Sequence, residues 1–152
     1  RQPSRYNLRR HRVPLRAGKS GKISLFQTDT SYLKFEVSGI PSVSKATIRL
    51  YVVDPSTSGG AIYPVSNNYR GTSTPWEENG LTWNNAPAIS GTPLSSLGAV
   101  QRGTWVEFDV TAVITGNGVY SFALANTASD IVDYSSSEGI QPPQLVIRTV
   151  GT

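Results

Sequence analysis

The chain has 152 residues, of which 38% are hydrophobic, with 14 glycines and 10 prolines, which suits one globular domain with its own core. It contains no cysteine, which excludes disulfides, thiolate catalysis and cysteine-ligated metal centres. The net charge of +4 is unevenly spread, because residues 1–22 carry eight cations and no acid, whereas ten acids face six cations in the remainder.

No apolar run approaches the roughly 20 residues of a membrane-spanning helix, and the chain starts at Arg1 without any methionine. A removed secretion signal and excision from a longer protein would both account for such a start. Of the two we expect export, and therefore a secreted, extracellular protein.

Residues 1–21 show no sustained alternation and are dominated by Arg, Ser, Pro and Gly. This composition predicts an extended or partly disordered basic arm before a sandwich domain at 22–152. Within the arm, only Val13 and Leu15 could pair as a short edge strand. The single histidine, His11, also lies in this arm. Because a Ser-His-Asp triad needs fixed geometry, we expect no histidine-based catalysis.

Alternation with a period of two recurs after the arm, in short segments separated by turn residues, and predicts antiparallel strands. The clearest segments are 32–37 and 47–53, and the others are 22–27, 61–66, 104–110, 119–126 and 144–148. The expected inward residues of the two clearest segments are Leu33, Phe35, Val37, Ile48, Leu50 and Val52. Their expected outward residues are Tyr32, Lys34, Glu36, Thr47, Arg49 and Tyr51.

Helical signals are scarce, and the best is a single turn at 109–114 that Asp109 or Thr111 could cap. The stretch 67–103 is rich in Asn, Ser, Thr, Pro and Gly, yet it contains two tryptophans. A floppy segment of that length would be unusual inside a compact domain. We therefore predict an all-β, jelly-roll-like sandwich of antiparallel strands with one long ordered loop and at most one short helical turn.

Five sequence blocks follow one another along residues 31–148. They are Tyr32-Leu33-Lys34-Phe35, Ala46-Thr47-Ile48-Arg49-Leu50-Tyr51, Trp76-Glu77 with Leu81-Thr82-Trp83-Asn84-Asn85-Ala86-Pro87, Trp105-Val106-Glu107-Phe108-Asp109-Val110-Thr111, and Pro142-Pro143-Gln144-Leu145-Val146. In this order and spacing they resemble the DNRLRE-type domain, also described as carbohydrate-binding module family 96. The resemblance implies a β-jelly-roll sandwich in secreted, multidomain proteins, with binding of acidic polysaccharide such as alginate in some members.

The chain departs from the family pattern in two places. Family members usually open with a strand that has an Ala-Asp-like start and an Asn-Tyr-Gly-type turn, and residues 1–21 contain neither. The family also tends to show Ser-Arg-Glu before its final Pro-Pro, where this chain has Ser136-Ser137-Glu138. The first strand is therefore expected to be absent or replaced by the basic arm.

The predicted ligand site joins the outward residues of the two clearest strands, which we expect to be neighbours. Tyr32, Lys34, Arg49 and Tyr51 would then lie on one outer face. Such a face suits uronate, because Arg pairs with carboxylate and Tyr offers a ring and a hydroxyl. Lys45, Tyr69 and Arg70 would extend this surface from flanking loops. The alternative is an ordinary solvated face on which Lys34 and Arg49 pair with Glu36.

The three tryptophans have two interpretations. Flat aromatic rings stack on the C–H surfaces of pyranoses, which would make them ligand contacts. Trp76 and Trp83 lie in loop blocks shared with the family, so we expect them to fasten the loop to the sandwich instead. We expect Trp105 to stack on its strand neighbours.

Two carboxylate pairs, Glu77-Glu78 and Glu107 with Asp109, have the composition that a glycosidase would need. Outward acids on a sandwich are usually just solvated, and in the resemblance the block around Glu107 is structural. We therefore predict that the protein is not an enzyme.

No cofactor is expected, and the one metal considered is a structural calcium, which jelly-roll binding modules often hold through carboxylates and backbone oxygens. Acids cluster near the last strand at Asp130, Asp133 and Glu138. Their spacing is not that of an EF-hand loop, so no residue is assigned as a metal ligand, and a structural calcium stays open as the one alternative.

The sequence thus predicts a noncatalytic, extracellular carbohydrate-binding module for acidic, alginate-like polysaccharide. The alternative is an extracellular structural subunit that assembles into a filament or sheath. A sandwich without its first strand leaves an edge that the arm at residues 1–21 of a neighbour could fill by strand addition, giving a homo-oligomer or polymer. The basic arm could also neutralise phosphates, but no recognised nucleic-acid motif accompanies it, so nucleic acid is not expected as a partner.

Overall fold

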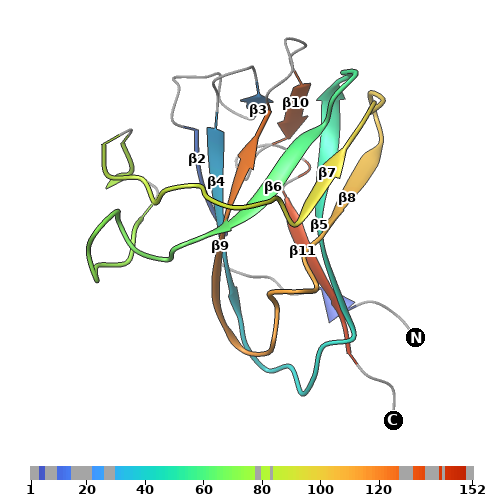
Figure 1. The fold of residues 1–152 in the computed structure, drawn as a ribbon. Coiled ribbons are helices and arrows are strands. Elements are labelled where there is room, and N and C mark those ends of the chain that lie inside the picture. The colour runs from blue at the N-terminus through green and yellow to red at the C-terminus, as the bar shows by residue number, and fades with distance from the viewer. Residues whose placement is uncertain are drawn as a thin grey trace.

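The computed structural model describes residues 4–5, 10–14, 22–25, 30–77, 80–82, 84–126, 132–135, 141 and 143–149, with backbone alone for the first three ranges and for Asp133. These residues form eleven strands and no helix. The strands build two antiparallel sheets that pack face to face (Figure 1). The predicted all-β sandwich is therefore confirmed. The described part of the chain contains no helix long and apolar enough to cross a membrane.

The first sheet, sheet A, has β5 at its centre. Its strands are β1 (Ser4–Arg5), β11 (Gln144–Arg148), β5 (Lys45–Asp54), β10 (Val132–Ser135) and β3 (Lys22–Leu25), with β8 (Trp105–Asp109) also paired to β5. The second sheet, sheet B, runs in the order β2 (Arg10–Pro14), β4 (Thr30–Val37), β9 (Gly118–Ala125), β6 (Gly60–Val65) and β7 (Ser95–Leu97).

The core lies between the sheets and consists of the inward side chains that alternation predicts. Leu33 and Phe35 of β4 face Ile48 and Leu50 of β5, and all four are at most 2% exposed. The rings of Phe35 and Phe122 lie 6.4 Å apart. Burial of each such side chain contributes about 1.5–3 kcal/mol, so the alternating pattern is what drives the two sheets together.

The predicted strand ranges agree closely with the structure at 144–148 and within a few residues at the other six segments. The strands β1, β7 and β10, of two to four residues each, are not among the predicted segments. The expected helical turn after β8 is a hydrogen-bonded turn at 111–113 instead. In it, the amide of Thr111 donates to the Oδ1 atom of Asp109, and that of Val113 donates to the carbonyl of Val110.

Two strands of the predicted basic arm pair within the chain itself. β1 pairs with β11 at the edge of sheet A, and β2 pairs with β4 along five residues at the edge of sheet B. Both of these edges are therefore covered by the same molecule. Assembly with a neighbour through this arm stays a prediction.

The expectation that the segments 32–37 and 47–53 are neighbouring strands is wrong. β4 pairs with β2 and β9 in sheet B, whereas β5 pairs with β8, β10 and β11 in sheet A. The physical reason is that both strands have a strongly apolar face, and the two faces bury each other across the core. Their outer faces consequently point in opposite directions.

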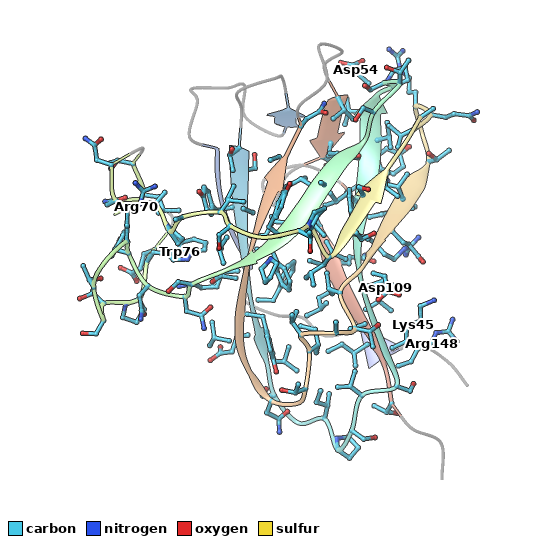
Figure 2. All side chains as sticks on the ribbon, in the orientation of Figure 1. Lys45, Asp54, Arg70, Trp76, Asp109 and Arg148 are labelled. Atoms are coloured by element: carbon cyan, nitrogen blue, oxygen red, sulfur yellow. The ribbon has the colours of Figure 1, made fainter. Side chains whose placement is uncertain are left out.

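The described residues of the long segment between β6 and β7 form an ordered loop that packs on the outer face of sheet B (Figure 1). A second apolar cluster forms there from Tyr32, Trp76, Leu81, Ala86 and Ala123. The side chain of Trp76 lies in this loop (Figure 2). It is 1% exposed, and its Nε1 atom donates to the carbonyl of Ser66. The prediction that this loop is pinned by its aromatic residues is confirmed for Trp76, while Trp83 lies outside the described residues.

Candidate functional site

The outer face of sheet A brings together side chains from three paired strands. On β5 the outward residues include Arg49 and Tyr51, because Ile48 and Leu50 point into the core. Arg49 lies opposite Gln144 of β11 on one side and Glu107 of β8 on the other. Tyr51 lies opposite Trp105 in the next row of β8. Directly opposed side chains in an antiparallel sheet share one face and are in contact distance.

Arg49, Tyr51 and Trp105 form a compact group on this face. The Cζ atom of Arg49 lies 4.6 Å from the centroid of the Trp105 ring, which is a cation–π arrangement. The rings of Tyr51 and Trp105 meet edge to face at 5.4 Å and 68°. Trp105 therefore stacks on its strand neighbours, as the sequence predicts, and it also forms part of the surface.

The guanidinium of Arg49 has incomplete hydrogen bonding. Its Nη1 atom donates to the Oε1 atom of Gln144 at 3.4 Å. Its Nε atom lies 3.5 Å from the Oε2 atom of Glu107, yet within the described residues that buried Nε has no hydrogen-bond partner. The Arg49 side chain is 18% exposed and that of Glu107 is 55% exposed. The planar cation is thus held in place by the ring of Trp105 while part of it still meets solvent.

Two further cations lie at one end of the same face. Lys45 of β5 is paired in register with Arg148 of β11, and both are exposed. Figure 2 shows their side chains together near Asp109. Lys45 is four residues before Arg49 in β5, which corresponds to about 13 Å along a strand. The face therefore has positive charge at two separate positions.

Glu107 and Asp109 share the outer face of β8 but have different partners. Asp109 accepts hydrogen bonds from the amide and the hydroxyl of Thr111. These hydrogen bonds lower the pKa of Asp109. Burial opposes the lowering, and Lys45 adds a smaller effect that lowers the pKa further. A carboxyl with a lowered pKa is a poor general acid, and Glu107 instead faces Arg49.

Tyr32 and Lys34 do point to the outer face of sheet B, but they do not form a solvated surface. The long loop covers them, and they are 3% and 8% exposed. The Tyr32 hydroxyl donates to the carbonyl of Pro87. Burial raises the pKa of Tyr32, with a smaller lowering by Arg70. The expectation that both residues share a wet face with Arg49 is wrong because the loop seals their side of the sandwich.

Lys34 of β4 holds the long loop on sheet B through hydrogen bonds to the loop backbone. Its Nζ atom donates to the carbonyl oxygens of Asn67 at 3.0 Å and Trp76 at 2.6 Å, and lies 4.2 Å from the Trp76 ring centroid. Burial lowers the pKa of Lys34, partly offset by Glu77. Glu36 is on the outer face of sheet B and cannot pair with Arg49 on the far sheet.

Tyr69 and Arg70 belong to the same loop and hold it in shape. The Tyr69 hydroxyl accepts a hydrogen bond from the amide of Glu77. The Nε atom of Arg70 donates to the carbonyl of Ala86 at 2.9 Å. Neither residue extends the surface around Arg49. The structure therefore brings Lys45, Arg49 and Tyr51 together and places the other four predicted residues on sheet B or its loop.

Sequence reasoning missed Gln144 and Arg148 as members of the face and assigned Trp105 to packing. Their signal was the alternation in 144–148 and 104–110, which places them on the outward sides. What alternation does not specify is that β8 and β11 flank β5.

The described residues contain no group of three or more His, Cys, Asp or Glu side chains that could hold a metal ion. Asp130 and Glu138, with the side chains of Asp133 and His11, lie outside that description. The prediction about calcium is therefore untested.

An antiparallel sandwich with rings and cations gathered on one outer sheet has the form of a ligand-binding module. A family model, carbohydrate-binding module family 96, matches residues 17–149, and the chain belongs to this family. The resemblance expected from the sequence is confirmed. A search of the curated proteins found no match to the chain.

Proposed function

We propose that this carbohydrate-binding module binds an acidic, alginate-like polysaccharide outside the cell, on the outer face of sheet A, and does not cleave it. The observation that carries the proposal is the guanidinium of Arg49, which lies over the Trp105 ring beside Tyr51. Lys45 and Arg148 supply a second cationic position on the same face.

The chemistry of the face matches that of a uronate. Guanidinium groups bind carboxylates through parallel, charge-assisted hydrogen bonds, and Arg49 is already oriented by its ring contact. The pyranose carries C–H groups that pack on aromatic surfaces, which Tyr51 and Trp105 provide. A ligand carboxylate would take the place of Glu107, whose 3.5 Å approach to Arg49 lacks hydrogen-bond geometry.

The absence of cleavage is proposed from the two carboxylates on this face. Glycoside hydrolysis needs one carboxyl that stays protonated and a second across the sugar. The lowered pKa of Asp109 and its hydrogen bonds to Thr111 fit a structural role.

The test is affinity electrophoresis in gels with and without alginate, with a neutral polysaccharide gel as a reference. Arg49→Gln and Trp105→Ala are expected to weaken retardation by alginate about tenfold each, as is typical of the loss of a charge-assisted hydrogen bond or a ring contact. Arg102→Gln is the matched control, because it makes the same change in net charge at a residue whose Nη2 atom already pairs with Asp54 at 3.0 Å. Normal retardation of both site variants, or equal loss in the control, would reject this face.

A further inference from the structure

A hollow of about 220 Å³ lies on the outer side of sheet B, away from the face just described. Its floor is a row of small side chains from three neighbouring strands. Ala61 of β6 is directly opposite Ser96 of β7 on one side and Ala125 of β9 on the other. These three residues line the hollow, and their small size is what leaves the space open.

Larger side chains border this floor. Tyr63, two residues along β6 and on the same face as Ala61, lines the hollow and is only half-buried. Leu97 also lines it, although its side chain packs against the core between the sheets. The polar lining comes from Ser58 and Asn126, whose Oγ and Oδ1 atoms are hydrogen-bonded at 3.1 Å. The hollow therefore offers a ring, apolar carbons and hydrogen-bonding groups together.

The rim beside Ser58 is held rigidly by the packing of Gly59. Its amide donates to the carbonyls of Leu97 and Gly98, and its own carbonyl accepts from the Tyr134 hydroxyl at 2.7 Å. A Cβ atom at Gly59 would lie 2.9 Å from three side-chain atoms. Gly60 has a φ of 92°, which favours glycine. A rim fixed in this way pays little ordering entropy when a ligand binds.

We infer that this hollow is a second sugar-binding site, which takes one ring of a neutral polysaccharide. None of the residues that line it is charged, in contrast to the face around Arg49. The volume is below the about 300–1,000 Å³ of pockets for drug-sized ligands, which suits a single pyranose. The site uses residues of sheet B and of the segments next to β6 and β9, and none from the face around Arg49, so it does not depend on the proposed function of sheet A.

Two such sites on opposite sheets would make the module bivalent. One face would hold an acidic chain and the other a neutral chain. Because linked sites raise the effective concentration of the second partner, the domain could then bridge two different polysaccharides.

The test is NMR of the full chain with ¹³C-labelled alanine methyls, titrated with mannohexaose, cellohexaose and, separately, oligoalginate. The methyls of Ala61 and Ala125 report on the floor of the hollow. We expect saturable shifts of both methyls with at least one neutral probe. Tyr63→Ala and Ser96→Leu should weaken that binding about tenfold, by removing the ring and by filling the space. Ser96 is exposed, so this variant is expected to fold.

Arg49→Gln is the matched control, and it should leave the response to the neutral probe unchanged while it weakens oligoalginate binding. Failure of the sheet A proposal alone would appear as unaltered oligoalginate binding in Arg49→Gln. The inference about the hollow is overturned if neither neutral probe shifts the two methyls. It is also overturned if Ser96→Leu, with an unchanged melting temperature, binds the neutral probe normally.

Discussion

The Nζ atom of Lys34 donates a 2.6 Å hydrogen bond to the carbonyl of Trp76 and lies 4.2 Å from the centroid of the ring of the same residue. One ammonium group of β4 thus contacts both the backbone and the side chain of Trp76 in the long loop. The contact attaches an outward residue of β4 to Trp76, which belongs to the second apolar cluster.

Replacement of Lys34 by Met is expected to lower the free energy of unfolding by about 1–3 kcal/mol. The substitution leaves the buried carbonyl of Trp76 without its donor, and such a buried unsatisfied group costs about 1–3 kcal/mol. The carbonyl of Asn67 keeps its hydrogen bond from the amide of Trp76. Urea unfolding measures the change. Lys45→Met is the control, because Lys45 is exposed and its loss should alter stability by less than about 0.5 kcal/mol. Equal effects of the two variants would contradict the fastening role.

The stability of the protein should fall at alkaline pH through Tyr134. Burial raises the pKa of this phenol far above its ordinary 10.0, so the folded state keeps a proton that the unfolded chain loses. The stabilisation that the protonated phenol gives to the folded state is fully present below pH 10 and is lost as the pH rises further.

Tyr134→Phe isolates this effect. The variant lacks the hydrogen bond to Gly59 and should be less stable by about 1–2 kcal/mol near neutral pH. The lowered pKa of Lys34 acts in the opposite sense at high pH, but it is common to both proteins and cancels. Urea unfolding is measured between neutral pH and the highest accessible pH. The difference in the free energy of unfolding between the unmodified protein and Tyr134→Phe should narrow above pH 10. A gap that stays constant or widens would contradict the assignment.

Asp109 should stabilise the turn after β8 in a manner that depends on acid pH. Asp109→Ala removes two hydrogen bonds to Thr111 and is expected to cost about 1 kcal/mol, as for loss of a capping side chain. Since the pKa of Asp109 is lowered from 3.8, this stability is present above that pH and disappears as the pH falls through the folded value. Thermal unfolding of both proteins from neutral pH to about pH 2 should converge at the acid end. If the two proteins still differ in stability at the acid end, the charge of Asp109 is not what stabilises the turn.

Deletion of residues 1–16 should promote self-association. It removes β1 and β2, which cover the edges of β11 and β4, and uncovered edge strands pair with other chains. Light scattering after size-exclusion chromatography, over a range of concentrations, would detect the dimers or larger species. A truncated chain that stays monomeric would contradict this expectation. If the full chain instead forms polymers that the deletion abolishes, assembly through the arm is the better account.

Binding on sheet A should weaken with salt. Charges at Lys45, Arg49 and Arg148 attract uronates through exposed contacts, which are screened when the Debye length falls from about 10 Å at 0.1 M to about 3 Å at 1 M. Alginate retardation should therefore fall strongly across this range. Binding of neutral mannohexaose or cellohexaose in the hollow beside Tyr63 should stay constant across the same range of salt. Salt-independent alginate binding would argue against the cationic face.

The alternating pattern of the sequence determined which side chains form the core. Leu33, Phe35, Ile48 and Leu50 are buried as predicted, because successive side chains of a strand alternate between its two faces and these apolar ones share the face toward the opposite sheet. The same local rule placed Arg49 and Tyr51 outward. It also correctly put Tyr32 and Lys34 on the opposite side of β4 from the core.

The tertiary structure alone decided what each outer face meets. β4 and β5 lie in different sheets, and a loop from the middle of the chain seals Lys34 while Arg49 stays in contact with solvent. Strand pairing and loop docking depend on contacts between residues far apart in sequence, and a local period contains no information about them. For that reason the residues of the candidate site could be listed by type from the sequence, but only the fold separated those at the surface from those that hold the loop.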